Sequence, residues 1–537
     1  MWALYALFAA AVLLETSFGS VTYADDIGAN LPFFEDISTW THVKGISFSL
    51  AEASMALLLL GLLLKVLSAR AVRFDRGSLL RPLGLYLLMV LVGEVHGLVS
   101  GGNTTTSLWE VRGQVYIIAA YVLTCNLVTT RRQVNALVWI LLLGTGLKGI
   151  QGVIRYQIEL GGNVHSVEAL FPHEQSFFFN AFLTLTAILF LYGGSRRMKT
   201  VALFFLPFVV VSNLANQRRA ATLALIVGMA ALLLVTALAH PRRRRTVIAI
   251  VALLAVAWPP YYAAFKNSTG LTGQIAHAVA SNNNPNARDA SSNLYRINED
   301  ADIMATMKST TTSALIGYGY GKPMFTPYPL ANISGTYIFW NIMPHNSILW
   351  IWMRLGTIGY LIFLSLMGMA IAQATGLVRR LRDPALKGLA LWSGVMVMQQ
   401  VIFGYLDLGM VNDRNLITLG VLFSLIGRLA TFARREEDDT AGPGDEPPPE
   451  ARRTWTRRPD LPRGLAIAGG RLVRAACAIG APWGAAGLAA NTMIWTTHGA
   501  PCAAGLPVAG EGRARTIVRH KKPQCVPVHE RRARVAR

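Results

Sequence analysis

The sequence predicts an all-α, polytopic membrane protein with about twelve transmembrane helices. Three observations support this fold class. Of the 537 residues, 53% are apolar and only 15% are charged, whereas a soluble domain carries roughly 25% charged residues. The mean hydropathy is +0.40. Apolar runs of about 20 residues recur, which is the length that a helix needs to cross a bilayer core about 30 Å thick, and the short alternating strands of a membrane β-barrel are not seen.

The apolar runs give the predicted spans in order. They lie at residues 2–20, 46–68, 83–101, 112–130, 134–153, 176–194, 199–216, 220–240, 246–265, 346–376, 386–410 and 415–433. The first run lacks a basic start and contains Glu15 after its apolar centre, so we interpret it as a helix rather than a signal peptide. One large extracytoplasmic loop, residues 266–345, precedes the tenth span.

Charged residues in the loops predict the orientation. Every second loop is basic, from Lys65 to Arg81 after the second run to Arg379–Arg382 after the tenth. The positive-inside rule makes these loops cytoplasmic, so both termini are expected inside and the other loops, including residues 266–345, outside. The net charge of +21 therefore reflects topology rather than nucleic-acid binding, and the four cysteines show neither a disulfide nor a metal pattern.

The chain divides into two parts. Residues 1–435 form the predicted transmembrane domain. Residues 436–537 begin with a charged, proline-rich linker and continue as a basic sequence rich in Ala, Gly and Pro. This composition predicts a mostly disordered cytoplasmic tail that is dispensable for activity.

Several ionisable residues lie on the predicted outer face, where the positive-inside rule does not account for them. Arg218 and Arg219 occupy a very short outward turn, and Lys148 and Arg155 lie near the outer end of the fifth run. Ionisable groups at membrane depth are unfavourable by a few kcal/mol, which makes each a functional hypothesis. Snorkelling of the arginines to lipid headgroups is the alternative explanation.

The large loop carries further candidates. Residues 293–316 have the apolar spacing of a surface helix, with Arg296 near its start. A glycine-rich turn, Gly317 to Gly321, follows, and Pro344-His345-Asn346 then opens a long apolar helix. The turn lacks the lysine and Ser/Thr of a P-loop. Tyr318 and Tyr320 offer faces for sugar stacking, although interfacial aromatics commonly serve as membrane anchors.

Three motifs in this order resemble the O-antigen ligase/polymerase family of membrane glycosyltransferases. The first, NQRRAATLALIVG, contains Arg219. The second is Arg296 followed by the turn GYGYG, and the third is His345-Asn346-x-x-Leu349 with Gly356 and Gly359. The family often has an acidic residue nine positions after the histidine, where this chain has Arg354.

The resemblance implies transfer of a glycan from a polyprenyl pyrophosphate, such as undecaprenyl pyrophosphate, to an acceptor hydroxyl, without a metal or another cofactor. Arginines bind phosphate oxygens bidentately, so Arg219 and Arg296 are expected to hold the pyrophosphate. Histidine titrates near neutral pH, so His345 is expected to act as the base. The remaining candidates for substrate binding are Arg218, Asn346, Lys148, Arg155, Tyr318 and Tyr320.

Some choices stay open at this stage. A ligase, a polymerase and a protein O-glycosyltransferase share this chemistry, which leaves a sugar or protein hydroxyl as acceptor. A polytopic transporter or a non-catalytic component of a polysaccharide assembly system are the alternatives, although a transporter would show paired repeats. Arg354 lies about 13 Å below His345 and on another side of its helix, so we expect it to pair with an acidic group elsewhere, with Asp407 as the candidate.

Overall fold

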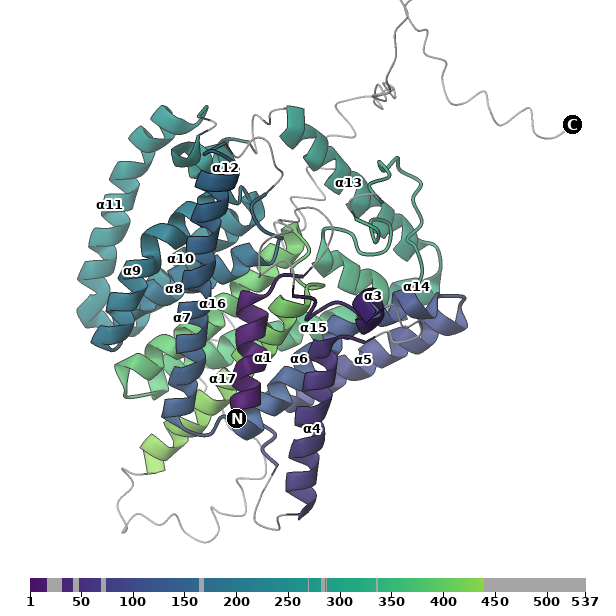
Figure 1. Ribbon diagram of the computed structural model, residues 1–537, viewed down its shortest axis with the longest axis horizontal. Helices are drawn as coiled ribbons and strands as arrows, with labels where there is room; N and C mark the ends of the chain where they lie inside the picture. Colours follow the sequence, from purple (N-terminus) through teal and green to yellow (C-terminus); the bar gives the residue numbers. More distant parts are fainter. Residues whose placement is uncertain are drawn as a thin grey trace, which may run out of the picture. The chain divides into compact units, whose positions relative to one another are not determined.

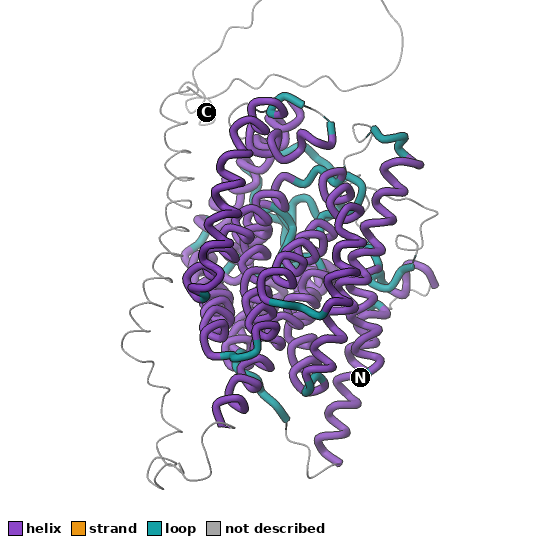
Figure 2. The backbone as a smooth tube through the Cα atoms, turned by 90° about the vertical axis from the view of Figure 1, so that its left-hand side faces the viewer, coloured by secondary structure: helices purple, strands orange, loops and turns teal. Residues whose placement is uncertain are grey.

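The computed structural model describes residues 1–16, 31–41, 48–68, 74–163, 169–268, 270–281, 285, 287–334 and 337–438. These residues form an all-helical protein, without a strand among them (Figure 1; Figure 2). The predicted tail falls outside the described residues, apart from its first three residues, 436–438, at the end of the last helix. Nothing in the structure therefore bears on the expected character of the tail.

Each of the twelve predicted runs overlaps one helix. These helices are α1 (Trp2–Leu13), α4 (Leu50–Ser68), α5 (Leu80–Val99), α6 (Thr104–Leu127), α7 (Arg131–Ile154), α8 (Gln175–Tyr192), α9 (Arg196–Ala215), α10 (Arg219–Ala239), α11 (Pro241–Phe265), α15 (Ser347–Arg380), α16 (Pro384–Leu406) and α17 (Asp413–Asp438). Among the described residues, ten helices are long and apolar enough to cross a membrane. The two others are α1, which has only 12 residues, and α6, which buries Glu110, Arg112 and Gln114.

The helices differ in how far they are enclosed. The most enclosed spans are α17, α8 and α16, whereas α4 and α11 are the least enclosed and lie at the edge of the bundle in Figure 1. Only Val247 is buried along α11. A helix that is apolar on all sides and exposed at the edge is suited to contact with lipid tails.

In the described part of the chain, the region between α11 and α15 contains four helical segments, followed by non-helical residues at 317–334 and 337–346. It contains η3 (Leu271–Gly273), α12 (Gln274–Ala280), α13 (Ala287–Lys308) and α14 (Thr311–Ile316). The predicted surface helix 293–316 is thus two helices, because the Thr310 side chain accepts a hydrogen bond from the Ser313 backbone N–H (3.0 Å) and starts a new helix there. α13 packs against α14 and α15.

The glycine-rich turn fills a break in α15. Gly356 is non-helical (φ 66°, ψ −175°), and at this break the Tyr318 N–H donates to the carbonyl of Met353 at 2.7 Å. A Cβ on Gly317 would lie 2.2 Å from the Arg354 carbonyl oxygen. The turn needs glycine because it packs backbone against backbone at positive φ.

A buried ion pair fixes this turn to the bundle. The guanidinium of Arg354 contacts Glu110 of α6 at 2.6 Å, and both side chains are fully enclosed. Arg354 also donates to the carbonyls of Gly319 and Ile342, each at 2.9 Å. The expectation that Arg354 pairs with Asp407 was wrong, since α6 supplies a nearer carboxylate at the same depth as the arginine.

Candidate functional site

One side of α13 contacts polar residues near the start of α10, just before α15 and just after α16. Asn293, Arg296 and Glu299 follow one another at intervals of three residues, so they lie along one side of the helix. Each contacts a different element: Asn293 binds Arg219, Arg296 faces Asp407, and Glu299 binds His345. A helix at the surface thus joins three segments that are at least 60 residues apart in the sequence.

His345 is held by Glu299 from two directions. Its Nδ1 lies 2.9 Å from one Glu299 carboxylate oxygen and 3.1 Å from the other. The His345 backbone N–H also donates to Glu299, at 3.3 Å. The ring edge of Tyr295 packs against the imidazole, with 5.8 Å between centroids. A carboxylate at Nδ1 selects the tautomer that carries its proton there and leaves Nε2 as an acceptor.

A second histidine–carboxylate pair lies beside the first. His173 precedes α8, and its Nδ1 lies 2.7 Å from Asp407, which follows α16. The other oxygen of Asp407 faces the guanidinium of Arg296 at 3.9 Å. The rings of His173 and His345 have centroids 6.4 Å apart. Arg296 and His345 therefore lie at one site, with Asp407 and His173 between them.

The arginine pair starts α10 after a tight turn. Gln217 has φ 53°, the one positive value among the described non-glycine residues, and such strain is often found at functional positions. Arg219 donates to Ser281 (3.3 Å) and Asn293 (3.1 Å) and lies 3.6 Å from Asp289. Through Asn293 it reaches α13 one turn before Arg296.

Arg218 directly precedes Arg219 and is the N-cap residue of α10. Its charge acts on both His173 and Asp407 and lowers the pKa of each. The structure thus brings Arg218, Arg219, Arg296 and His345 together around α13. No side-chain hydrogen bond caps the start of α10 among the described residues, so the positive end of its helix dipole adds to this cationic region.

Burial and neighbouring charges determine the protonation states of Asp407, His173 and Asp300 at this site. Burial acts to raise the pKa of the Asp407 carboxyl, but His173, Arg296 and Arg218 outweigh it and hold that pKa below its ordinary value. Burial and the nearby Arg218 lower the pKa of His173. Asp407 is therefore a carboxylate and His173 a neutral imidazole at neutral pH. Burial raises the pKa of Asp300, next to Glu299, to about 7.

Asn346 has two structural contacts. Its side-chain oxygen accepts from the Leu349 backbone N–H at 3.1 Å and caps α15. Its side chain also forms a hydrogen bond with Asp300 that lowers the pKa of that carboxyl. Asn346 thereby fixes the start of the helix directly after His345.

The other predicted residues lie apart from these contacts. Tyr320 is fully buried and packs on Trp350, while Tyr318 lies under the ammonium group of Lys322. Lys148 and Arg155 both contact Glu15, at 2.6 and 2.9 Å, and are almost completely buried. Their predicted role in substrate binding stays a prediction.

Sequence reasoning did not select His173, Glu299 or Asp407 as site residues. Each left a signal: His173 follows a proline before an aromatic run, Glu299 lies three residues after Arg296, and Asp407 is an acidic residue inside the apolar run 386–410. The sequence does not show that His173 and Asp407 contact each other, because they are separated by 234 positions (407 − 173). No group of three or more His, Cys, Asp or Glu residues in the described part of the chain could hold a metal ion.

The spans and the site define a multi-pass membrane protein with a cationic site at the ends of its helices. Residues 182–364 match the family model described as O-Antigen ligase, so the comparison supports the O-antigen ligase/polymerase family and a membrane glycosyltransferase-like role. The matched stretch includes Arg219, Arg296 and His345, whereas His173 and Asp407 lie outside it. No curated protein matches the chain.

Proposed function

We propose that this protein transfers a glycan from a polyprenyl-pyrophosphate carrier to an acceptor hydroxyl on the extracytoplasmic face of a bacterial inner membrane. The observation that supports this most is the convergence of two arginines, Arg219 and Arg296, with a carboxylate-bound histidine along α13. A donor of this kind contains a diphosphate and a sugar. The reaction needs a cationic group to bind the diphosphate and a base to deprotonate the hydroxyl that accepts the sugar. The site has both.

The arginines would bind the diphosphate of the donor. Arg219 and Arg296 are 23% and 32% exposed, so a ligand can reach them. Their carboxylate contacts are long, 3.6 Å to Asp289 and 3.9 Å to Asp407, and a diphosphate could replace these contacts with shorter, charge-assisted hydrogen bonds. Arg218 and the positive end of α10 add to the attraction for an anion.

His345 would act as the general base. The acceptor oxygen attacks the anomeric carbon while its proton passes to Nε2 of His345. The bond between that carbon and the phosphate oxygen breaks, and its electron pair leaves with the polyprenyl diphosphate. Glu299 at Nδ1 stabilises the imidazolium that forms, and the arginines stabilise the charge that develops on the leaving group.

Asp407 would align the two halves of the site. Its carboxylate contacts His173 on one side and Arg296 on the other. It thereby restrains the direction of Arg296 while leaving the guanidinium within reach of a ligand. Lys148, Arg155 and the buried Tyr320 have no role in this proposal. The proposed reaction needs no nucleotide, metal or other cofactor.

Purified protein in detergent or nanodiscs, supplied with a polyprenyl-pyrophosphate glycan, tests the proposal. We expect release of polyprenyl diphosphate together with transfer of the glycan when membranes that contain the native acceptor are added. His345→Ala should abolish both, whereas His240→Ala, at the other end of α10, should not. Transport of the intact donor without cleavage, or equal activity of the His345→Ala variant, would contradict the proposal.

A further inference from the structure

His173 closely resembles the proposed base, yet it has no role in the reaction described above. The Nδ1 atom of His173 lies 2.7 Å from Asp407, and that of His345 lies 2.9 Å from Glu299. The two histidine side chains are 17% and 18% exposed, so a ligand can reach both. The site thus contains two carboxylate-bound imidazoles, with 6.4 Å between their ring centroids.

The Nε2 atom is the side of each ring that is open to a ligand. Among the described residues, Nε2 of neither histidine takes part in a hydrogen bond or an ion pair. A carboxylate at Nδ1 places the ring proton there and leaves a lone pair on Nε2. Burial and Arg218 lower the pKa of His173, so this ring is neutral at neutral pH. Its Nε2 can therefore accept a hydrogen bond but not donate one.

The segment that carries His173 is fixed on both sides. The Asn216 side chain accepts a hydrogen bond from the Phe171 N–H at 2.7 Å and donates one to the Ser176 hydroxyl at 2.8 Å. Asn216 itself lies two residues before Arg218, so these bonds also fix the segment relative to the arginine turn. A group that is held in place before a ligand arrives loses little conformational freedom when it binds.

The position of His173 matches that of the transferred sugar. In a glycan donor, this sugar is bonded to the diphosphate and is attacked by the acceptor at the same carbon. In the proposed reaction Arg296 binds the diphosphate, and His345 deprotonates the acceptor. His173 lies between them, because Asp407 contacts both His173 and Arg296 and the two histidine rings are neighbours.

We infer that His173 binds the transferred sugar, with its Nε2 accepting a hydrogen bond from a hydroxyl or amide N–H group of that sugar. This inference rests on the function proposed above. The diphosphate is a poorer partner for Nε2, because ionised phosphate oxygens have no proton to donate to a lone pair. The groups of the donor that do carry such protons are in the glycan.

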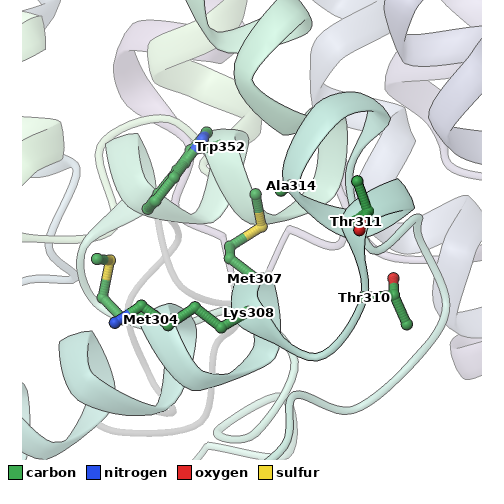
Figure 3. A pocket seen from close by; sticks show the side chains of 7 residues that line it. All are labelled: Met304, Met307, Lys308, Thr310, Thr311, Ala314 and Trp352. Carbon is green, nitrogen blue, oxygen red and sulfur yellow. The ribbon is translucent and has the colours of Figure 1, made fainter.

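A hollow between α13, α14 and α15 lies away from these residues (Figure 3). Its volume is about 430 Å³, and it is lined by Met304, Met307, Lys308, Thr310, Thr311, Ala314 and Trp352. Met304 and Lys308 follow Glu299 by five and nine positions, which places them on the opposite side of α13. The sugar that reacts beside His345 is therefore not expected in this hollow.

Binding measurements with two ligands test the inference. Purified protein in nanodiscs is titrated, without an acceptor, with a polyprenyl-pyrophosphate glycan and separately with polyprenyl diphosphate that carries no sugar. We expect His173→Asn to raise the Kd of the glycan-bearing ligand about fivefold or more, as the loss of a hydrogen-bond partner does, and to leave the Kd of the sugar-free ligand within about twofold of the wild type. Arg296→Lys should raise both Kd values.

A second variant separates a sugar contact from a structural role. Asparagine keeps an amide N–H where His173 has Nδ1, so it can still bind Asp407, whereas glutamine keeps an acceptor near the position of Nε2. A sugar contact predicts that His173→Gln binds the glycan-bearing ligand more tightly than His173→Asn does. A residue that only positions Asp407 would give the reverse order. His240→Asn, at the other end of α10, is the matched control and should alter neither Kd.

Three results would overturn the inference. They are unchanged binding of the glycan-bearing ligand by His173→Asn, an equal loss of affinity for both ligands, and the reverse order of the two variants. An equal loss in His240→Asn would have the same consequence. Failure of the proposed function looks different, because the wild type would then bind neither ligand or would release no polyprenyl diphosphate from the donor when acceptor membranes are added.

Discussion

Two ion-pair regions of this protein use the same residue types for opposite purposes. In the Glu110–Arg354 pair, both side chains are fully enclosed and 2.6 Å apart. Arg354 is further bound to two backbone carbonyls, and Glu110 accepts from the Gly321 N–H and from the Trp350 indole. Along α13, by contrast, Arg219 and Arg296 are partly exposed and lie 3.6 and 3.9 Å from their carboxylates.

The difference in burial and contact distance between these two regions distinguishes charged residues that stabilise the fold from those that can bind a ligand. A buried arginine with short contacts from each nitrogen has no capacity left for a ligand, and its loss leaves a buried carboxylate without a partner. An arginine at a longer distance from its carboxylate can exchange that contact for a ligand. Sequence position alone does not make this distinction, because Arg354 and Arg296 both lie within the matched family region.

The largest expected effect comes from breaking the enclosed pair. Arg354→Gln should lower the free energy of unfolding by roughly 3–5 kcal/mol, because Glu110 is left buried without its countercharge. Thermal unfolding in detergent and the amount of protein in the membrane measure this change. Arg296→Gln is the comparison and should leave both nearly unchanged while impairing transfer. A similar loss of stability in the two variants would remove the distinction.

The next effect concerns the proposed base and its carboxylate. His345→Ala should reduce transfer by roughly 10²–10⁴-fold, the contribution of general base catalysis, with normal insertion into the membrane. Glu299→Gln should give a smaller loss and shift the pH profile of transfer, because the neutral amide stabilises the imidazolium less. If Glu299→Gln has the pH profile of the wild type, Glu299 does not act through His345.

A third prediction sharpens the roles of the exposed arginines. Arg219→Lys and Arg296→Lys keep the charge and lose the bidentate geometry, so each should reduce transfer by roughly 10²-fold, as the loss of one preorganised donor does. The initial rate of polyprenyl diphosphate release is the measurement. Arg379→Lys, at the other end of α15, serves as the matched control. Unimpaired lysine variants would show that the arginines act only as charges.

The smallest effect is a pH dependence of stability at Asp300. Burial raises the pKa of this carboxyl to about 7 in the folded protein, compared with roughly 4 in an unfolded chain. The folded state thus binds the proton more tightly, and stability declines as the pH rises between these two values. Asp300→Asn should remove this decline, so melting temperatures measured from pH 4 to pH 8 should fall less in the variant. An unchanged slope would contradict the assignment.

The sequence by itself determined the class of the protein. Long apolar runs, interrupted by basic loops, predicted twelve helices, and each run overlaps one. The physical reason is that a segment in lipid must satisfy its own backbone hydrogen bonds, which a helix does. Arg218, Arg219, Arg296 and His345 could also be selected from the sequence, because the arginine pair lies in a short outward turn and because three motifs of the family resemblance contain Arg219, Arg296 and His345.

Only the tertiary structure decided which charges face one another. Glu110 rather than Asp407 pairs with Arg354, and Asp407 instead contacts His173 and approaches Arg296. These contacts join α6 to α15, and the residues after α16 to those before α8, at separations for which no local pattern exists. The reason is physical: a helix period fixes the side on which a residue lies, whereas its partner depends on how the helices pack.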